Sequence, residues 1–177
     1  LAENECVFTE RFKGSTLSVN RLELKRNPDG LPFAEIEYLE NSRTLEELLD
    51  ECLQNNDEAG FDKLFDRYCK IAAWKAEGTK QDYDLTFPNI CVQGDIWTMI
   101  DYEWTTDKLT PQQIISRALN CYGQEDPVRM EHPIVKKPSA SAKSRCGSFR
   151  KKSWRSSTLS CRKRTGGAGR LLGSFGI

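Results

Sequence analysis

Three residues with oxygen-bearing side chains, Asp84, Asn89 and Asp101, are spaced so that they could do chemistry together. Asp84 and Asn89 stand just before a short apolar run at 90–92, and Asp101 stands just after a second one at 97–100. A Gly-Asp turn separates the runs, which predicts a β-hairpin. Because the open end of a hairpin brings its two flanks together, we expect both carboxylates and the amide to converge. Such oxygen donors are the ligands that a hard divalent cation such as Mg²⁺ prefers.

The order of these motifs resembles the catalytic centre of the protein-kinase-like fold. The wording D-L-T-F-P-N at 84–89 and I-D-Y-E at 100–103 is most similar to the aminoglycoside phosphotransferase and choline kinase branch. That branch writes the motifs H-x-D-x-x-x-x-N and I-D-[WFY]-E. The resemblance implies that Asp84 is the catalytic aspartate that orients the substrate hydroxyl. It implies that Asn89 and Asp101 bind the metal ion.

The chain departs from this family at Asp82, where relatives usually carry histidine. The departure removes no residue that acts on phosphate, and the 17 residues from Asp84 to Asp101 suit the loop, hairpin and loop of the family. An ordinary hairpin with acidic ends is the alternative, since Asp and Asn are common turn residues.

The charge of the chain is unevenly distributed. The 177 residues are enough for one domain or a small pair, and their net charge is zero. Residues 1–132 hold 14 basic and 26 acidic residues, a net charge of −12, whereas 133–177 hold twelve basic residues and no acidic one. The second segment is rich in Ser, Lys, Arg and Gly, so we expect a disordered basic tail. Clustered Lys and Arg would suit nucleic acid or an anionic surface. A solvated tail or translation in a non-native frame are the alternatives.

Cysteine usage favours a reducing compartment. The seven cysteines form no C-x-x-C pair and His132 is the only histidine, which disfavours a structural zinc site. Their odd number and irregular spacing disfavour a secreted disulfide framework, so we expect reduced thiols and a cytoplasmic location. No apolar run is long enough for a transmembrane helix, and no signal peptide opens the chain. Because the first residue is Leu1, we expect a fragment or a processed product.

The first forty residues predict antiparallel strands. Segments 16–25 and 33–39 alternate apolar and polar residues, and an Asn-Pro-Asp-Gly turn lies between them. The kinase-like resemblance makes 1–40 a partial small lobe. Under it, Glu37, Tyr38 and Leu39 are the strand and hinge where the adenine of ATP binds in relatives. The alternative is an ordinary connection from a strand to a helix.

Residues 41–132 predict a mainly helical large lobe, which makes the fold class α+β. Thr44 with a glutamate three residues later forms a capping box, and apolar residues follow at helical spacing. A second amphipathic helix runs from about residue 61 to 74. A third begins at Thr110, which is followed by Pro111 and by Gln113, three residues after Thr110, as the capping glutamine.

Parts of a complete phosphotransferase are missing from the sequence. No glycine-rich phosphate loop precedes residue 82, and Lys13 and Lys25, the only lysines ahead of the hinge, have no recognisable partner. We therefore expect a kinase-like domain fragment with a remnant Mg²⁺ and phosphate site, weakly active or inactive alone. Catalytic competence stays open. An active chain would be an ATP-dependent phosphotransferase acting on a hydroxyl of a small molecule or sugar.

The alternative function is a non-catalytic module. The wording D-Y-D-L and I-D-Y-E-W-T is also similar to kinase-like segments in bacterial cell-surface polysaccharide proteins, where they lie beside glycosyltransferase or S-adenosylmethionine-dependent methyltransferase domains. No nucleotide-sugar or S-adenosylmethionine motif is visible in this chain. Its partner would then be a neighbouring transferase domain.

Overall fold

The computed structural model describes residues 2–136, which fold into helices and small sheets of the expected α+β class. In chain order the helices are α1 (Ala2–Phe12), α2 (Leu45–Gln54), α3 (Glu58–Ala73), α4 (Pro111–Glu125), α5 (Pro127–Glu131) and α6 (Pro133–Lys136), with a 3-10 turn at Phe87–Asn89. The strands are β1 (Leu17–Val19), β2 (Leu22–Arg26), β3 (Pro32–Ile36), β4 (Arg43–Thr44), β5 (Gln81–Asp82), β6 (Ile90–Gln93), β7 (Ile96–Met99) and β8 (Thr105–Thr106).

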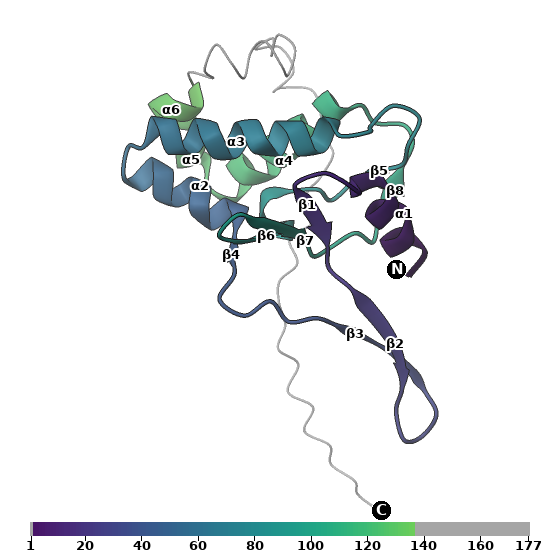
Figure 1. The fold of residues 1–177 in the computed structure, drawn as a ribbon. Helices are drawn as coiled ribbons and strands as arrows, with labels where there is room; N and C mark the ends of the chain where they lie inside the picture. The colour runs from purple at the N-terminus through teal and green to yellow at the C-terminus, as the bar shows by residue number, and fades with distance from the viewer. Residues whose placement is uncertain (1, 137–177) are drawn as a thin grey trace, which may run out of the picture.

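The predicted hairpin is the centre of the largest sheet. Strands β6 and β7 pair antiparallel, with Ile90 opposite Met99 and Gln93 opposite Ile96. The four-stranded order is β1-β7-β6-β4, in which β1 runs parallel to β7. Helices α2, α3 and α4 pack together on one side of this sheet, and α1 lies near its β1 edge (Figure 1). The hairpin prediction is therefore confirmed.

A cluster of aromatic rings fixes the segment that leads into β6. The ring of Phe87 is fully buried, with its centroid 4.9 Å from that of Tyr68 on α3 and 5.4 Å from that of Tyr122 on α4. Both contacts are edge to face, the favourable geometry for aromatic pairs. The loop that carries Asp84 and Asn89 is thus anchored to the two longest helices.

The helix starts follow the predicted capping chemistry. Thr44 and Glu47 form a reciprocal capping box at α2, and Thr110 and Gln113 form a second one at α4. Each box satisfies backbone N–H groups that the first turn of a helix leaves without partners. Both capping predictions are confirmed.

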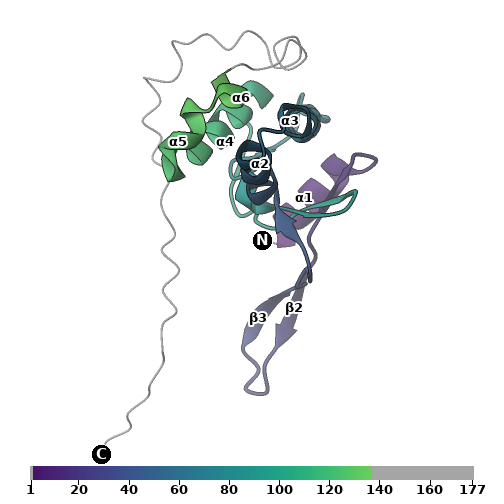
Figure 2. The ribbon, with the colours of Figure 1, turned by 90° about the vertical axis from the view of Figure 1, so that its left-hand side faces the viewer.

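The strand expected at 16–25 is two strands that belong to different sheets. Their break falls at Asn20, whose backbone N–H donates to the carbonyl of Met99 at 2.9 Å and whose side-chain amide donates to the carbonyl of Glu37 at 3.0 Å. Strand β1 therefore stays with β7, and β2 turns away to pair antiparallel with β3. The hairpin of β2 and β3 projects from the rest of the molecule (Figure 2).

Residues 2–19 do not form a unit separate from the helical part. The sequence of the first forty residues predicts strands and no helix, yet α1 occupies Ala2–Phe12. Phe8, Phe12 and Leu17 are buried in the same core as α2, α3 and α4. Helix α1 and strand β1 therefore share one core with α2, α3 and α4, and the expected division at residue 40 stays a prediction.

The first four residues of the expected basic tail, 133–136, are described and helical. Pro133 starts the short helix α6, in which the side chain of Ile134 is buried against the core. Proline suits the first turn of a helix because its missing N–H needs no partner there. The expected basic tail otherwise lies at 137–177, outside the described residues.

Among the described residues, the cysteines that are free thiols are Cys6, Cys52, Cys69, Cys91 and Cys121. Within residues 2–136, no helix combines the length and the apolar character that crossing a membrane requires.

Candidate functional site

Buried groups fix the conformation of the loop formed by residues 83–89. The hydroxyl of Tyr68 donates to the carbonyl of Leu85 at 2.7 Å, and both side chains are buried. The backbone N–H of Thr86 donates to the carbonyl of Asp84 at 2.6 Å, which closes a tight turn. Together with the buried ring of Phe87, these bonds give the loop one defined conformation.

Asn89 ties the two ends of this loop together. Its side-chain Nδ2 donates to the carbonyl of Asp84 at 2.8 Å. Its own carbonyl accepts from the backbone N–H of Ile100 at 3.0 Å. Asn89 thus connects the residue before the turn with the end of β7, one position before Asp101.

The segment that follows Asp101 is fastened from several elements. The carbonyl of Trp104 accepts from the N–H of Tyr83 at 2.9 Å, next to the short pairing of β5 with β8. The side-chain amide of Asn4 on α1 donates to the carbonyls of Tyr102 and Glu103, at 2.9 and 2.8 Å. The chain on both sides of the candidate site is therefore fixed by long-range contacts.

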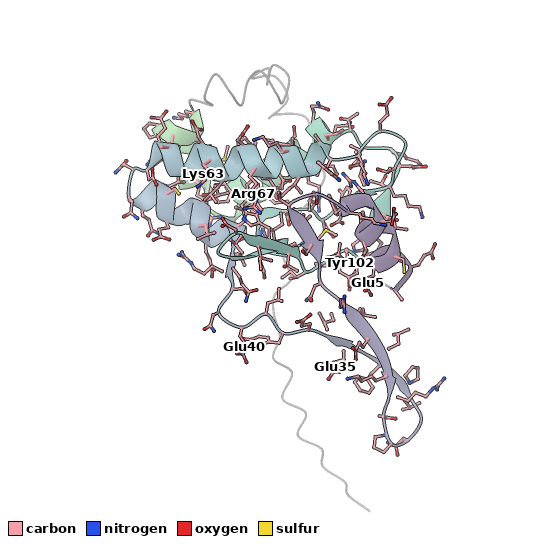
Figure 3. All side chains as sticks on the ribbon, in the orientation of Figure 1. Glu5, Glu35, Glu40, Lys63, Arg67 and Tyr102 are labelled. Carbon is pink, nitrogen blue, oxygen red and sulfur yellow. The ribbon has the colours of Figure 1, made fainter. Side chains whose placement is uncertain are left out.

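Tyr102 adds a buried anchor to the same segment. Its ring is buried and its hydroxyl donates to the carbonyl of Asn20 at 2.8 Å. Figure 3 places it beside Glu5, whose charge acts on it in the same direction as burial. Burial raises the pKa of Tyr102 to about 12, so its hydroxyl stays protonated and serves as a donor.

Asp82 is the buried acidic residue next to the candidate site. Its side chain is fully buried, and its Oδ1 accepts from the backbone N–H of Asp84 at 3.0 Å. Its Oδ2 has no hydrogen-bond partner among the described residues. Burial, together with the charges of Asp84 and Asp101, raises its pKa well above the ordinary value, against the opposing effects of the Asp84 N–H and Arg11.

The electrostatic coupling of Asp82 to both Asp84 and Asp101 means that three acidic side chains share one region. Asp84 and Asp101 are both half-buried. With Asn89, the sequence-predicted residues supply two carboxylates and one amide. No cluster of three or more His, Cys, Asp and Glu side chains in the described part of the chain has the arrangement of a metal site.

Arg117 on α4 is a site residue that the sequence did not reveal. Its Nη2 lies 2.8 Å from Oδ1 of Asp84, and its Nε donates to the carbonyl of Tyr83 at 2.9 Å. The guanidinium also stacks on the ring of Tyr83, 3.8 Å from the centroid. Burial lowers the pKa of Arg117, but its hydrogen bond to Asp84 and nearby negative groups leave it raised overall.

One sequence signal could have pointed to Arg117. It lies three residues after Ile114 and immediately before Ala118, and both of these side chains are buried. The Arg117 side chain therefore leaves the helix backbone close to its buried face. A charged residue in that position needs a partner of opposite charge. The identity of that partner depends on how α4 packs against the loop, which the sequence does not encode locally.

The expected hinge residues are connector residues with bonds of their own. The carbonyl of Glu37 accepts from Asn20, and the carbonyl of Leu39 accepts from the hydroxyl of Ser42 at 2.8 Å. The side chain of Tyr38 is 83% exposed. Glu37, Tyr38 and Leu39 therefore form an open surface segment between β3 and β4.

Comparison of the chain with protein-family models and with curated proteins finds no match.

Proposed function

We propose that this chain is a phosphotransferase-type domain whose Asp84, Asn89 and Asp101 form a Mg²⁺ and phosphate site. The observation that carries the proposal is the hydrogen bond from Nδ2 of Asn89 to the carbonyl of Asp84. Together with the bond from Ile100 to Asn89, it links both motifs at the open end of one hairpin. The order of motifs along the chain supports the same assignment.

In this proposal Asp84 orients a substrate hydroxyl, and Asn89 and Asp101 supply oxygen ligands to the metal ion. The support for a positive charge here is that Oδ2 of Asp82 is buried without a described partner, and that the charges of Asp84 and Asp101 both act on Asp82. When bound, Mg²⁺ would neutralise charge on a phosphate group. The backbone N–H of Asp84 donates to Oδ1 of Asp82, which fixes the backbone of Asp84.

We further propose that the chain alone has little or no transfer activity. One carboxylate oxygen of Asp84 is already paired with Arg117. The two lysines ahead of the connector pair with surface glutamates: Lys13 with Glu10 at 3.6 Å, and Lys25 with Glu23 at 3.3 Å. Both lysines are exposed at the surface, whereas the lysine that holds ATP phosphates in kinase-like enzymes lies inside the nucleotide site.

The second candidate is a non-catalytic module beside a bacterial glycosyltransferase or methyltransferase domain. The ion pair between Asp84 and Arg117 favours it, because a catalytic aspartate held by an arginine can serve a structural role instead. Under this reading Arg117, Tyr83 and Asp84 staple α4 to the loop.

Isothermal titration calorimetry of the full chain with MgCl₂, and then with MgATP, separates the two candidates. The first candidate predicts weak Mg²⁺ binding that Asp101→Ala abolishes, and little gain in affinity with ATP. The matched control is Asp107→Ala, which removes an exposed carboxylate from the next loop. Absence of Mg²⁺ binding, or equal binding by both variants, would refute the site. Micromolar MgATP affinity lost in Asp101→Ala would refute the proposed inactivity.

A further inference from the structure

The hairpin of β2 and β3 exposes apolar side chains outside the body of the molecule (Figure 2). Leu24 is 69% exposed and Ile36 is 49% exposed, and Leu31 and Phe33 are exposed as well. A two-stranded hairpin is at best marginally stable in water, and further strands or a packed face stabilise it. The hairpin thus has an unpartnered surface of the kind that binds another chain.

The two faces of the hairpin carry different side chains. In the pairing register Leu22 faces Ile36 and Glu23 faces Glu35. Because side chains alternate along a strand, Leu22, Leu24 and Ile36 share one face. The other face carries Glu23, Lys25 and Glu35, with Phe33 opposite Lys25. Figure 3 shows Glu35 on the projecting part of this hairpin.

The backbone hydrogen bonds define which groups of β2 point outward. The N–H of Glu37 donates to the carbonyl of Arg21, and the N–H of Asn27 donates to the carbonyl of Leu31. In an antiparallel pair, hydrogen-bonded and non-hydrogen-bonded positions alternate. The backbone N–H and carbonyl groups of the odd-numbered residues of β2 therefore point toward β3. Those of Leu22, Leu24 and Arg26 point away from it.

The outward edge of β2 is the more complete of the two edges. The N–H of Leu22 is bonded to Oε2 of Glu5 at 3.3 Å. The carbonyl of Leu22, both backbone groups of Leu24 and the N–H of Arg26 remain directed outward. On β3 the corresponding positions begin with Pro32, which has no N–H to donate. An added strand would therefore find a better ladder on β2.

We propose that the β2 edge is an interface for a second copy of this chain. The two β2 strands pair antiparallel around a two-fold axis at Leu24, which gives the strand order β3-β2-β2-β3. The N–H of each Leu24 donates to the carbonyl of Leu24 in the other copy. The N–H of each Arg26 donates to the carbonyl of Leu22 in the other copy. These are the outward groups that the hairpin leaves available.

The charges of β2 are self-complementary in this register. Glu23 of one copy lies opposite Lys25 of the other, twice, at positions where side chains of facing strands are closest. Moving the two-fold axis by one residue would place Lys25 opposite Lys25 or Glu23 opposite Glu23, and like charges directly opposite are destabilising. The charge pattern therefore selects the axis at Leu24.

The second copy also relieves a conflict within the hairpin. Glu23 and Glu35 face each other, and one lysine, Lys25, bonds to Glu35 and lies 3.3 Å from Glu23. In the dimer, Lys25 of the other copy brings a second positive charge to Glu23. On the opposite face the two Leu24 side chains lie side by side and lose exposed area. The interface is small, so the dimer is weak.

Analytical ultracentrifugation of the full 177-residue chain tests the proposal, with reductant present because Cys6 is exposed. The wild-type chain should show a concentration-dependent monomer–dimer equilibrium. Leu24→Pro removes the outward N–H without removing a bond to β3, and should raise the dissociation constant about tenfold or more. Ala34→Pro is the matched control on the β3 edge and should leave the dimer intact. Equal effects of both variants would overturn the assignment to β2.

A charge-reversal pair tests the register. Glu23→Lys puts lysines at 23 and 25, and Lys25→Glu puts glutamates at both positions, so each variant alone should be monomeric. Their mixture should form a heterodimer, since every facing pair then has opposite charge. Circular dichroism of each variant verifies folding. A monomeric wild-type chain at high concentration, or a mixture without heterodimers, would overturn the proposal.

Discussion

Asp82 acts on the candidate site through a backbone group. Its Oδ1 holds the N–H of Asp84, and this bond orients the peptide from which the Asp84 side chain projects. A buried carboxyl oxygen is a good acceptor for a backbone N–H. Asp82 therefore positions the backbone of Asp84 from a buried acidic side chain.

The pH dependence of stability should depend on Asp82. Burial raises its pKa in the folded chain above 3.8, so the folded state binds this proton more tightly than the unfolded state. Its contribution to the free energy of unfolding is complete below about pH 4 and declines as the pH rises through the folded-state pKa. Asp82→Asn cannot titrate, but its amide oxygen can still accept from Asp84.

We therefore expect Asp82→Asn to gain stability relative to the wild type between about pH 4 and pH 7. At a pH above the folded-state pKa, the gain is about 1.4 kcal/mol for each unit by which the folded-state pKa of Asp82 exceeds its unfolded-state pKa. Urea denaturation at several pH values measures it, and Asp107→Asn is the exposed control. Parallel pH profiles for the wild type and Asp82→Asn would contradict the assigned direction.

Helix α1 shows why an element can escape sequence reading. Its buried face consists of Phe8, Arg11 and Phe12, so one of three buried residues is charged and the apolar stripe is weak. Arg11 donates to the carbonyls of Ala72 at 3.1 Å and Trp74 at 3.2 Å, where α3 ends. Those carbonyls lie more than sixty residues away in sequence. The capping boxes, in contrast, were predictable because their partners are three residues apart.

Removing the Arg11 side chain should destabilise the fold. It caps the carbonyl end of α3 and also donates to Lys80 at 3.3 Å, next to β5. Arg11→Ala leaves these buried acceptors without partners, and we expect a loss of about 3 kcal/mol in the free energy of unfolding. Chemical denaturation compares it with Arg21→Ala, an exposed control that should change by less than about 0.5 kcal/mol. Similar small losses in both would show that α1 does not stabilise α3.

At the scale of the molecule, local sequence patterns predicted the two hairpins. They did not predict the pairing of strands that are far apart in the chain. Alternating residues located β2 and β3, and two apolar runs located β6 and β7. In each case the antiparallel partner lies a short turn away. The parallel pairing of β1 with β7 joins segments separated by about eighty residues. Nothing in the three residues of β1 specifies that partner. The same reason hid Arg117, whereas Asp84, Asn89 and Asp101 were found because one hairpin connects them.

The C-terminal limit of the fold gives the last prediction, in which two shortened chains are compared. A chain that ends at Lys136 keeps α6 and the buried side chain of Ile134, whereas a chain that ends at His132 loses both. Burial of an isoleucine contributes about 1.5–3 kcal/mol, so the shorter chain should be less stable by about that amount. The point variant Ile134→Ser in the chain that ends at Lys136 should reproduce the loss.

The chain that ends at Lys136 should in turn be nearly as stable as the full chain. Removing 137–177 takes away eleven basic residues, but exposed opposite charges contribute about 0–1 kcal/mol per pair and are screened over about 8 Å at physiological salt. Thermal denaturation at low and high salt measures the difference. A small loss that disappears at high salt fits loose electrostatic association. A large loss that persists at high salt would mean that residues beyond 136 pack into the core, and the disordered-tail prediction would be wrong.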